Sequence, residues 1–199
     1  CLSLTLLLFD PCQNKPDTLF ELKEADDTGV YFNNLVEETD SFNILSYEYI
    51  YNGGGVAIAD FNNDDKQDIF FSGNQVPNKL YLNQGNFKFK DISDKAHITV
   101  DGRWNTGVAV VDINNDGWMD IYVCATTYPN PEDRRNMLFV NQGLDSSGEP
   151  TFKELANQYG IDYDGNSIMA AFYDYDRDGD LDLYIIENQK LNNVPTNYR

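Results

Sequence analysis

The chain has 199 residues, a formal net charge of −19 and a pI near 4.1. This excess of acidic residues argues against a nucleic-acid partner, because phosphate binding needs basic patches. The length suits one domain or part of a larger protein, and 13 Tyr with 12 Phe favour a β-rich core.

Residues 1–19 resemble a targeting signal and linker. An apolar run from Leu2 to Phe9 leads to Cys12, and a polar stretch follows it. The run is too short to span a bilayer but suits the hydrophobic part of a signal peptide. No initiator Met or basic segment precedes it, so we expect a truncated start. Lipidation of Cys12, plain secretion and a structural segment all stay open, because Phe9-Asp10-Pro11 replaces the small residues usual before a lipidated cysteine.

Residues 20–199 are predicted to form one repeat domain. The stretch from Phe20 to Tyr51 is irregular, and its Thr28-Gly29-Val30 matches Tyr159-Gly160-Ile161 further along. We therefore expect it to be the end of a preceding repeat unit.

The pattern D-x-[DN]-x-D-[DG]-x-x-D occurs three times, in loop one (60–68), loop two (112–120) and loop three (174–182). Oxygen-bearing side chains at alternate positions of a tight loop suit a hard cation such as Ca²⁺. Side chains one, three, five and nine and the backbone carbonyl of position seven are the predicted ligands. These are Asp60, Asn62, Asp64, Lys66 and Asp68; Asp112, Asn114, Asp116, Trp118 and Asp120; and Asp174, Asp176, Asp178, Asp180 and Asp182.

Position six of each loop must turn sharply, which suits Gly117 and Gly179, whereas Asp65 is expected to be strained but viable there. Loop three has four carboxylates among its side-chain ligands and should bind Ca²⁺ most tightly. An EF-hand is disfavoured because its Glu at position twelve is replaced by apolar residues. Mg²⁺ is disfavoured because it rarely uses an all-protein cage. Plain polar turns remain the alternative to a metal site.

Each loop lies between two short apolar runs rich in β-branched and aromatic residues, which read as buried strands. These runs are 55–59 and 68–72, 107–111 and 120–124, and 169–173 and 182–186. Two further strands follow in the first two units, at 78–83 and 87–92 and at 136–141 and 151–155. Four antiparallel strands per repeat indicate the blade of a β-propeller.

The predicted fold is therefore all-β, with about three blades present. An Ala three residues before each loop (Ala57, Ala109 and Ala171) suggests close packing on a neighbouring sheet. Propellers usually need four to eight blades, so we expect a fragment whose remaining blades belong to a longer chain. Insertions at 126–135 and 145–150 are expected on one face, which is often the binding face.

From about Phe32 to Asn188, these motifs resemble the FG-GAP/VCBS repeat family, whose calcium loops also occur in the propellers of integrin α subunits. They are similar in particular to a bacterial cartilage acidic protein-like group of secreted propellers. The resemblance implies a β-propeller, structural Ca²⁺ in each loop, and adhesion or ligand binding outside the cell or at its surface, including display as an outer-membrane lipoprotein. Asp65 and Met169 depart from the family's glycines.

No nucleophile elbow, zinc-protease motif or phosphate loop is found in the sequence, and we predict no enzyme activity. The one histidine, His97, reads as a turn residue, and Cys124 reads as a core residue. Trp104 and Trp118 are expected to be structural, although aromatic rings also stack on sugars.

Three functions stay open. The first is a calcium-stabilised module that binds an extracellular protein or glycan. The second is a catalytic or noncatalytic part of a carbohydrate-active enzyme, which paired carboxylates in the missing region would support. The third is a structural spacer at the cell surface. The fold alone cannot name a ligand.

Overall fold

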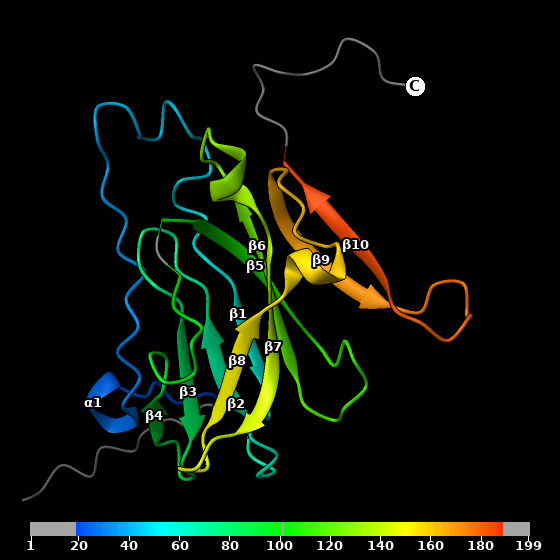
Figure 1. The fold of residues 1–199 in the computed structure, drawn as a ribbon. Helices are drawn as coiled ribbons and strands as arrows, with labels where there is room; N and C mark the ends of the chain where they lie inside the picture. The colour runs from blue at the N-terminus through cyan, green and yellow to red at the C-terminus, as the bar shows by residue number, and fades with distance from the viewer. Residues whose placement is uncertain (1–18, 101, 189–199) are drawn as a thin grey trace, which may run out of the picture.

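The structure is a computed structural model that describes residues 19–100 and 102–188 (Figure 1). Nearly all of the predicted signal segment, including Cys12, lies outside the described residues. No helix in the described part of the chain has the length and apolar character needed to cross a membrane.

The described residues form two complete four-stranded antiparallel sheets and one two-stranded hairpin. We call them blade one, blade two and blade three (Figure 1). Blade one comprises β1 (Val56–Ala59), β2 (Asp68–Phe71), β3 (Lys79–Asn83) and β4 (Phe89–Asp91); blade two comprises β5 (Trp104–Val111), β6 (Asp120–Thr126), β7 (Met137–Leu144) and β8 (Pro150–Glu154); blade three comprises β9 (Ser167–Tyr173) and β10 (Asp182–Glu187). The prediction of an all-β fold with four-stranded antiparallel blades is confirmed.

Each predicted metal loop is the hairpin connection between the first two strands of its blade. The register places Ala59 opposite Asp68, Val111 opposite Asp120 and Tyr173 opposite Asp182. The first and last aspartates of a loop therefore lie at the ends of paired strands. This arrangement follows from the sequence, since two strand-forming runs joined by a tight polar loop make a hairpin.

The blades pack face to face through two apolar clusters. Between blades one and two, the cluster includes Phe70, Leu80, Val123 and Phe139. Between blades two and three, it includes Tyr122, Cys124, Leu138 and Ala170, with Phe172 and Ile185 partly buried against them. The core is thus made between sheets, as expected for strands whose two faces both carry apolar residues.

The first strands of the blades lie next to one another, with β5 in contact with both β1 and β9. A side chain at Gly55 would collide with the carbonyl of Thr106, and one at Gly107 would collide with the carbonyl of Ile168. Glycine is needed at these two positions because the next first strand approaches so closely. Met169 occupies the matching position in blade three and is 45% exposed.

The segments Thr28-Gly29-Val30 and Tyr159-Gly160-Ile161, which match in sequence, also have the same local conformation. Short helices α1 (Ala25–Thr28) and α2 (Ala156–Tyr159) both end at a left-handed glycine, with φ of 83° at Gly29 and 70° at Gly160. His97, with φ of 57°, has this conformation before Ile98, in the connection from blade one to blade two. His97 is therefore a turn residue, as predicted.

The irregular segment before blade one covers the start of β5. Phe42 and Tyr47 contact the ring of Trp104 at centroid distances of 5.0 and 5.7 Å. Trp104 is buried in this cluster, so its ring is structural and is not available for sugar stacking.

Candidate functional site

All three predicted metal loops have the same backbone conformation. The fourth and sixth positions have positive φ in every copy: 55° and 64° at Asn63 and Asp65, 57° and 86° at Asn115 and Gly117, and 64° and 100° at Arg177 and Gly179. Asp65 therefore adopts the left-handed conformation expected of it. A non-glycine residue there carries strain, which the hydrogen bonds of the loop must offset.

The first aspartate of each loop holds the turn closed. Its carboxylate accepts hydrogen bonds from the backbone N–H groups of positions five and six. The two distances are 3.1 and 2.7 Å at Asp60, 3.0 and 2.8 Å at Asp112, and both are 3.2 Å at Asp174. The third and fifth side chains add similar short-range bonds, as in Asn114 and Asp178. Such Asx turns order the loop without an ion, so the polar-turn alternative explains the same contacts.

The last aspartate of each loop ties the hairpin to the third strand. Asp68 is fully buried and accepts from the backbone N–H of Phe61 at 3.0 Å and of Asn83 at 2.8 Å. Asp120 is likewise buried and accepts from Ile113 and Asn141. Burial raises the pKa of each carboxyl to about 6, against the lowering effect of these backbone bonds.

Asp182 differs because the described part of blade three has no third strand. Among the described residues, its carboxylate accepts one hydrogen bond, from the backbone N–H of Tyr175 at 2.8 Å, and Asp182 is exposed. Loop three is therefore less enclosed than loops one and two.

Sequence reasoning missed the asparagines that brace the loops from outside. Asn83 Nδ2 donates to the carbonyl of Gln67, and Asn141 Nδ2 donates to the carbonyls of Met119 and Phe61. Both residues begin the Asn-x-Gly turns seen in the sequence, where they also accept from the glycine N–H. Their repetition in two units was the signal that could have shown a second role.

A further contact joins two loops directly. Asn63 Nδ2 donates to the carbonyl of Gly117 at 3.2 Å, which links loop one to loop two. Nothing in the motif predicts this bond, because it depends on how neighbouring blades are stacked.

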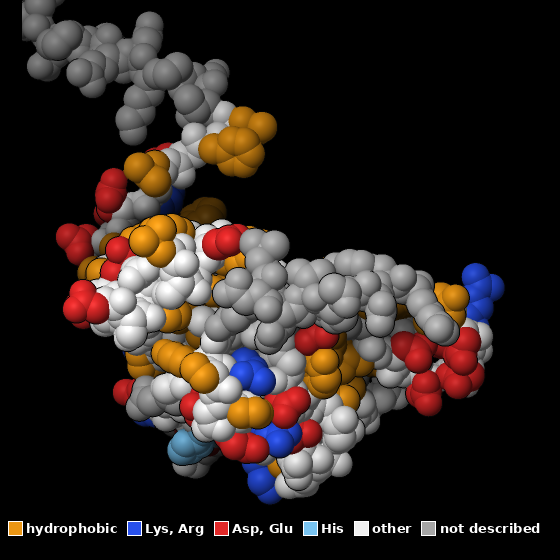
Figure 2. Space-filling model, turned by 90° about the horizontal axis from the view of Figure 1, so that it is seen from above, with side chains coloured by type: hydrophobic (Ala, Val, Ile, Leu, Met, Phe, Trp, Pro, Cys, Tyr) orange, Lys and Arg blue, Asp and Glu red, His pale blue; other side chains and the backbone are white. Residues whose placement is uncertain are grey.

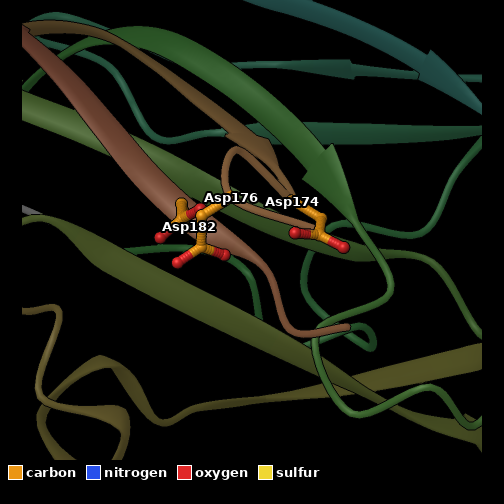
Figure 3. A group of neighbouring side chains, drawn as sticks. All are labelled: Asp174, Asp176 and Asp182. Carbon is orange, nitrogen blue, oxygen red and sulfur yellow. The ribbon is translucent and has the colours of Figure 1, made fainter. Parts of the chain in front are cut away.

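Two observations test whether the loops fit a cation. In loop one, Asn62 Oδ1 is buried and has no hydrogen-bond partner among the described residues, although buried oxygens are nearly always paired. In loop three, carboxylate oxygens of Asp174, Asp176 and Asp182 lie within 4.8 Å of one another (Figure 3). Figure 2 shows acidic side chains gathered at the edge of the molecule where Figure 1 places this hairpin. These donor sets fit a hard cation such as Ca²⁺.

Loop one contains a competitor for that cation. Lys66 Nζ lies 2.9 Å from Asp64 Oδ2 and 43% of its side chain is exposed, so the pair is weak and can be displaced. The backbone carbonyls of Lys66, Trp118 and Asp180 stay predicted ligands, since no contact in the described structure tests them.

Cys124 does not contribute to the site. It is a free, fully buried thiol, and burial raises its pKa to about 12, so it is a core residue as predicted. Trp118 is half-buried, and its ring lies beside Gly143 near the end of β7.

The blades and loops define a repeat protein of four-stranded units with aspartate-rich hairpins. Residues 60–123 match the family model described as an FG-GAP-like repeat, a region that spans loops one and two. This match confirms the predicted resemblance to the FG-GAP repeat family.

The chain is also similar to cartilage acidic protein 1 from three animals. It is 27% identical over 187 residues to the Xenopus tropicalis protein, which covers 92% of this chain and 27% of that protein. It is 28% identical over 142 residues to the proteins of Mus musculus and Homo sapiens, which covers 70% of this chain and 21% of each. The chain therefore spans about a quarter of the length of these relatives.

Proposed function

We propose that this chain is a calcium-binding module of an extracellular protein, in which Ca²⁺ holds the hairpin loops of the blades. The observation that carries the proposal is the buried, unpartnered Oδ1 of Asn62, at a position where the motif predicts a ligand. The in-register carboxylates of the other two loops would hold the ion in the same way, with the side chains of positions one, three, five and nine as ligands.

Calcium in these loops would act mainly on stability. The first aspartate directly follows one strand of a hairpin and the ninth begins the other, as with Asp112 and Asp120, so one ion would cross-link the two strands. Three divalent ions would also cancel six of the formal charges, which changes −19 to about −13. Less repulsion among carboxylates and a cross-linked hairpin both favour the folded state.

The proposed module is non-catalytic and binds a protein or glycan ligand outside the cell or at its surface. The similarity to a protein named cartilage acidic protein 1 supports an extracellular setting. The insertion at 126–135 supports a binding role, because it builds a short helix, η1 (Pro131–Arg134), at the end of the strands opposite the metal loops (Figure 1). Surface display through a lipid on Cys12 is part of the same proposal, as is completion of the blades by a longer chain.

Thermal unfolding in EDTA, in millimolar Ca²⁺ and in millimolar Mg²⁺ tests the proposal. At a free Ca²⁺ concentration a hundred times the dissociation constant, each occupied site should stabilise the folded chain by about 2.7 kcal/mol. Mg²⁺ should have little effect. Calorimetric titration of the folded chain should show that Ca²⁺ binds and that Mg²⁺ binds much more weakly. The charge-matched variants Asp178→Ala and Asp133→Ala provide the control, since Asp133 lies in η1, away from the loops.

A Ca²⁺ response smaller by the share of one site in Asp178→Ala, with an unchanged response in Asp133→Ala, would support the ligand assignment. If Ca²⁺ neither binds the folded chain nor raises its unfolding temperature, the loops are plain turns and the proposal is wrong.

A further inference from the structure

A polar hollow of about 320 Å³ lies at the end of blade two opposite its metal loop. Its walls come from the residue before β5, the start of β7, the end of β8 and the connection between α2 and β9 (Figure 1). Glu132 and Arg135, from the insertion at 126–135, form one side. Seen from this end, acidic and basic side chains are interleaved (Figure 2).

Arg103 is the group in this hollow that most needs a partner. It is half-buried, and it is in none of the ion pairs within 4.0 Å that the described residues form. Its one described hydrogen bond runs from Nη1 to the backbone carbonyl of Arg135. Burial lowers the pKa of Arg103, against the opposing attraction of Glu154, Asp133 and Glu132. A half-buried cation that has no carboxylate partner among the described residues is costly.

Arg135, in contrast, is fully engaged. Its Nε and Nη2 donate to Glu132 at 2.9 and 3.0 Å, and its Nη1 donates to Asp162 Oδ2 at 3.0 Å. The free donors of the hollow are therefore those of Arg103. A guanidinium offers them in a planar fork that matches a carboxylate.

The same hollow offers hydrogen-bond acceptors. Glu154 uses Oε1 to accept from the backbone N–H groups of Leu138 and Ala156, at 3.2 and 2.9 Å. Asp162 uses Oδ2 to accept from Arg135 and Asn157. The described hydrogen bonds thus leave one oxygen of each carboxylate for a ligand. These oxygens would repel a second anionic group but would accept hydroxyl groups.

We propose that this hollow binds a hexuronate, with the sugar carboxylate on the Arg103 guanidinium and its hydroxyls on Glu154 and Asp162. A neutral sugar would leave the guanidinium unpaired, and an acidic peptide would bring carboxylates without the hydroxyls that the acceptors need. The volume is at the lower end of that of small-molecule sites, which suits one sugar ring. The inference names a ligand for the module proposed above and so rests on that function, but it uses none of the calcium ligands.

Titration of the 199-residue chain in Ca²⁺ with D-glucuronate and D-galacturonate tests this site, with calorimetry and saturation-transfer NMR as readouts. D-Glucose, D-galactose and acetate are the comparison ligands. A uronate should bind at least about tenfold more tightly than its neutral sugar and than acetate. The neutral sugar lacks the carboxylate, and acetate lacks the hydroxyl groups. Equal binding of a uronate and its neutral sugar, equal binding of a uronate and acetate, or no uronate binding at millimolar concentrations would overturn the proposal.

Arg103→Gln should weaken uronate binding about 10- to 100-fold, since it removes a charged hydrogen-bond donor. Lys153→Gln is the matched control, because it removes one positive charge from an exposed position beside Glu154 and should leave affinity unchanged. Both variants should keep the Ca²⁺ response of thermal unfolding, which separates failure of this site from failure of the calcium proposal.

If Arg103→Gln does not fold, Arg103→Lys carries the test. It keeps the charge but loses the planar fork, so uronate affinity should fall several-fold. Unchanged uronate affinity in a folded variant of Arg103 would overturn the proposal.

Discussion

Blades two and three carry the same motif but differ in burial. Tyr122 and Tyr184 are both the second residue after the last aspartate of a loop. Tyr122 is 0% exposed, and its hydroxyl donates to the carbonyl of Ile161 at 2.7 Å. Tyr184 is 64% exposed. Two residues further on, Cys124 is 0% exposed and Ile186 is 50% exposed.

The difference shows that the apolar face of a blade is buried only where the next blade packs against it. Tyr122 and Cys124 are covered by blade three, whereas no described element covers the matching face of β10. Gly107 and Met169 differ for the same reason. Glycine occurs at position 107, where the first strand of the next blade approaches closely. A repeat sequence therefore encodes two apolar faces, and its neighbours decide which of them contributes to stability.

Tyr122→Ala and Tyr184→Ala should give the largest contrast. The Tyr122 variant should lose about 3–5 kcal/mol of unfolding free energy, because it leaves a cavity between two blades. The Tyr184 variant should change by no more than about 0.5 kcal/mol, as at other exposed positions. Urea denaturation of both variants measures the difference. Equal losses would mean that the two faces are buried alike in solution.

Asp178→Ala should reduce Ca²⁺ affinity about tenfold more than Asn114→Ala, because it removes a charged ligand and not a neutral one. The comparison is balanced, since each side chain accepts one backbone hydrogen bond in its loop, at 3.1 Å for Asp178 and 3.2 Å for Asn114. Calorimetric titration with Ca²⁺ measures both. Equal affinities of the two variants would refute the ligand assignment.

Ala109→Leu should destabilise the fold by about 1–3 kcal/mol through overpacking. Ala109 packs on the cluster between blades two and three, whereas the matching Ala171 of blade three is exposed. The prediction that this alanine packs closely on a neighbouring sheet is therefore wrong for Ala171, because no described sheet packs against its face of blade three. Ala171→Leu is the control and should be nearly neutral in thermal unfolding; a similar loss in both would contradict the contrast.

Glu149→Gln should give the smallest effect, about 1 kcal/mol after allowance for solvent screening. The side chain of Glu149 is only 7% exposed and pairs with Lys90 and Lys95 of the preceding unit, whose own side chains are more than half exposed. Hydrogen bonds from both lysines hold the pKa of Glu149 below its usual value. The stabilisation is therefore complete above the usual glutamate pKa and is lost as pH falls through the lowered one.

Unfolding of the Glu149→Gln variant and of the native chain should be compared at neutral and acidic pH. The two stabilities should converge in acid, while the exposed control Glu48→Gln should change little at either pH. A difference that persists at low pH would show that packing, and not charge, is responsible.

Much of the fold and of the candidate site was determined by the sequence. The three motif copies predicted the hairpin loops, and the strand-forming runs beside them predicted β1 to β10 within a residue or two at most ends. The left-handed conformation of Asp65 and the turn at His97 also followed from local chemistry, because a tight turn needs positive φ at one particular position. These features depend on residues close together in the chain.

Tertiary structure alone decided the rest. The bond from Asn63 to Gly117, the bracing of loop one by Asn141, the exposure of Tyr184 and the hollow around Arg103 all join or separate segments that are far apart in sequence. Each of these features depends on which blades are neighbours in the fold. A periodic sequence specifies its repeating unit through short-range hydrogen bonds and alternation, whereas burial and unpaired charge are set by the neighbours that stacking supplies.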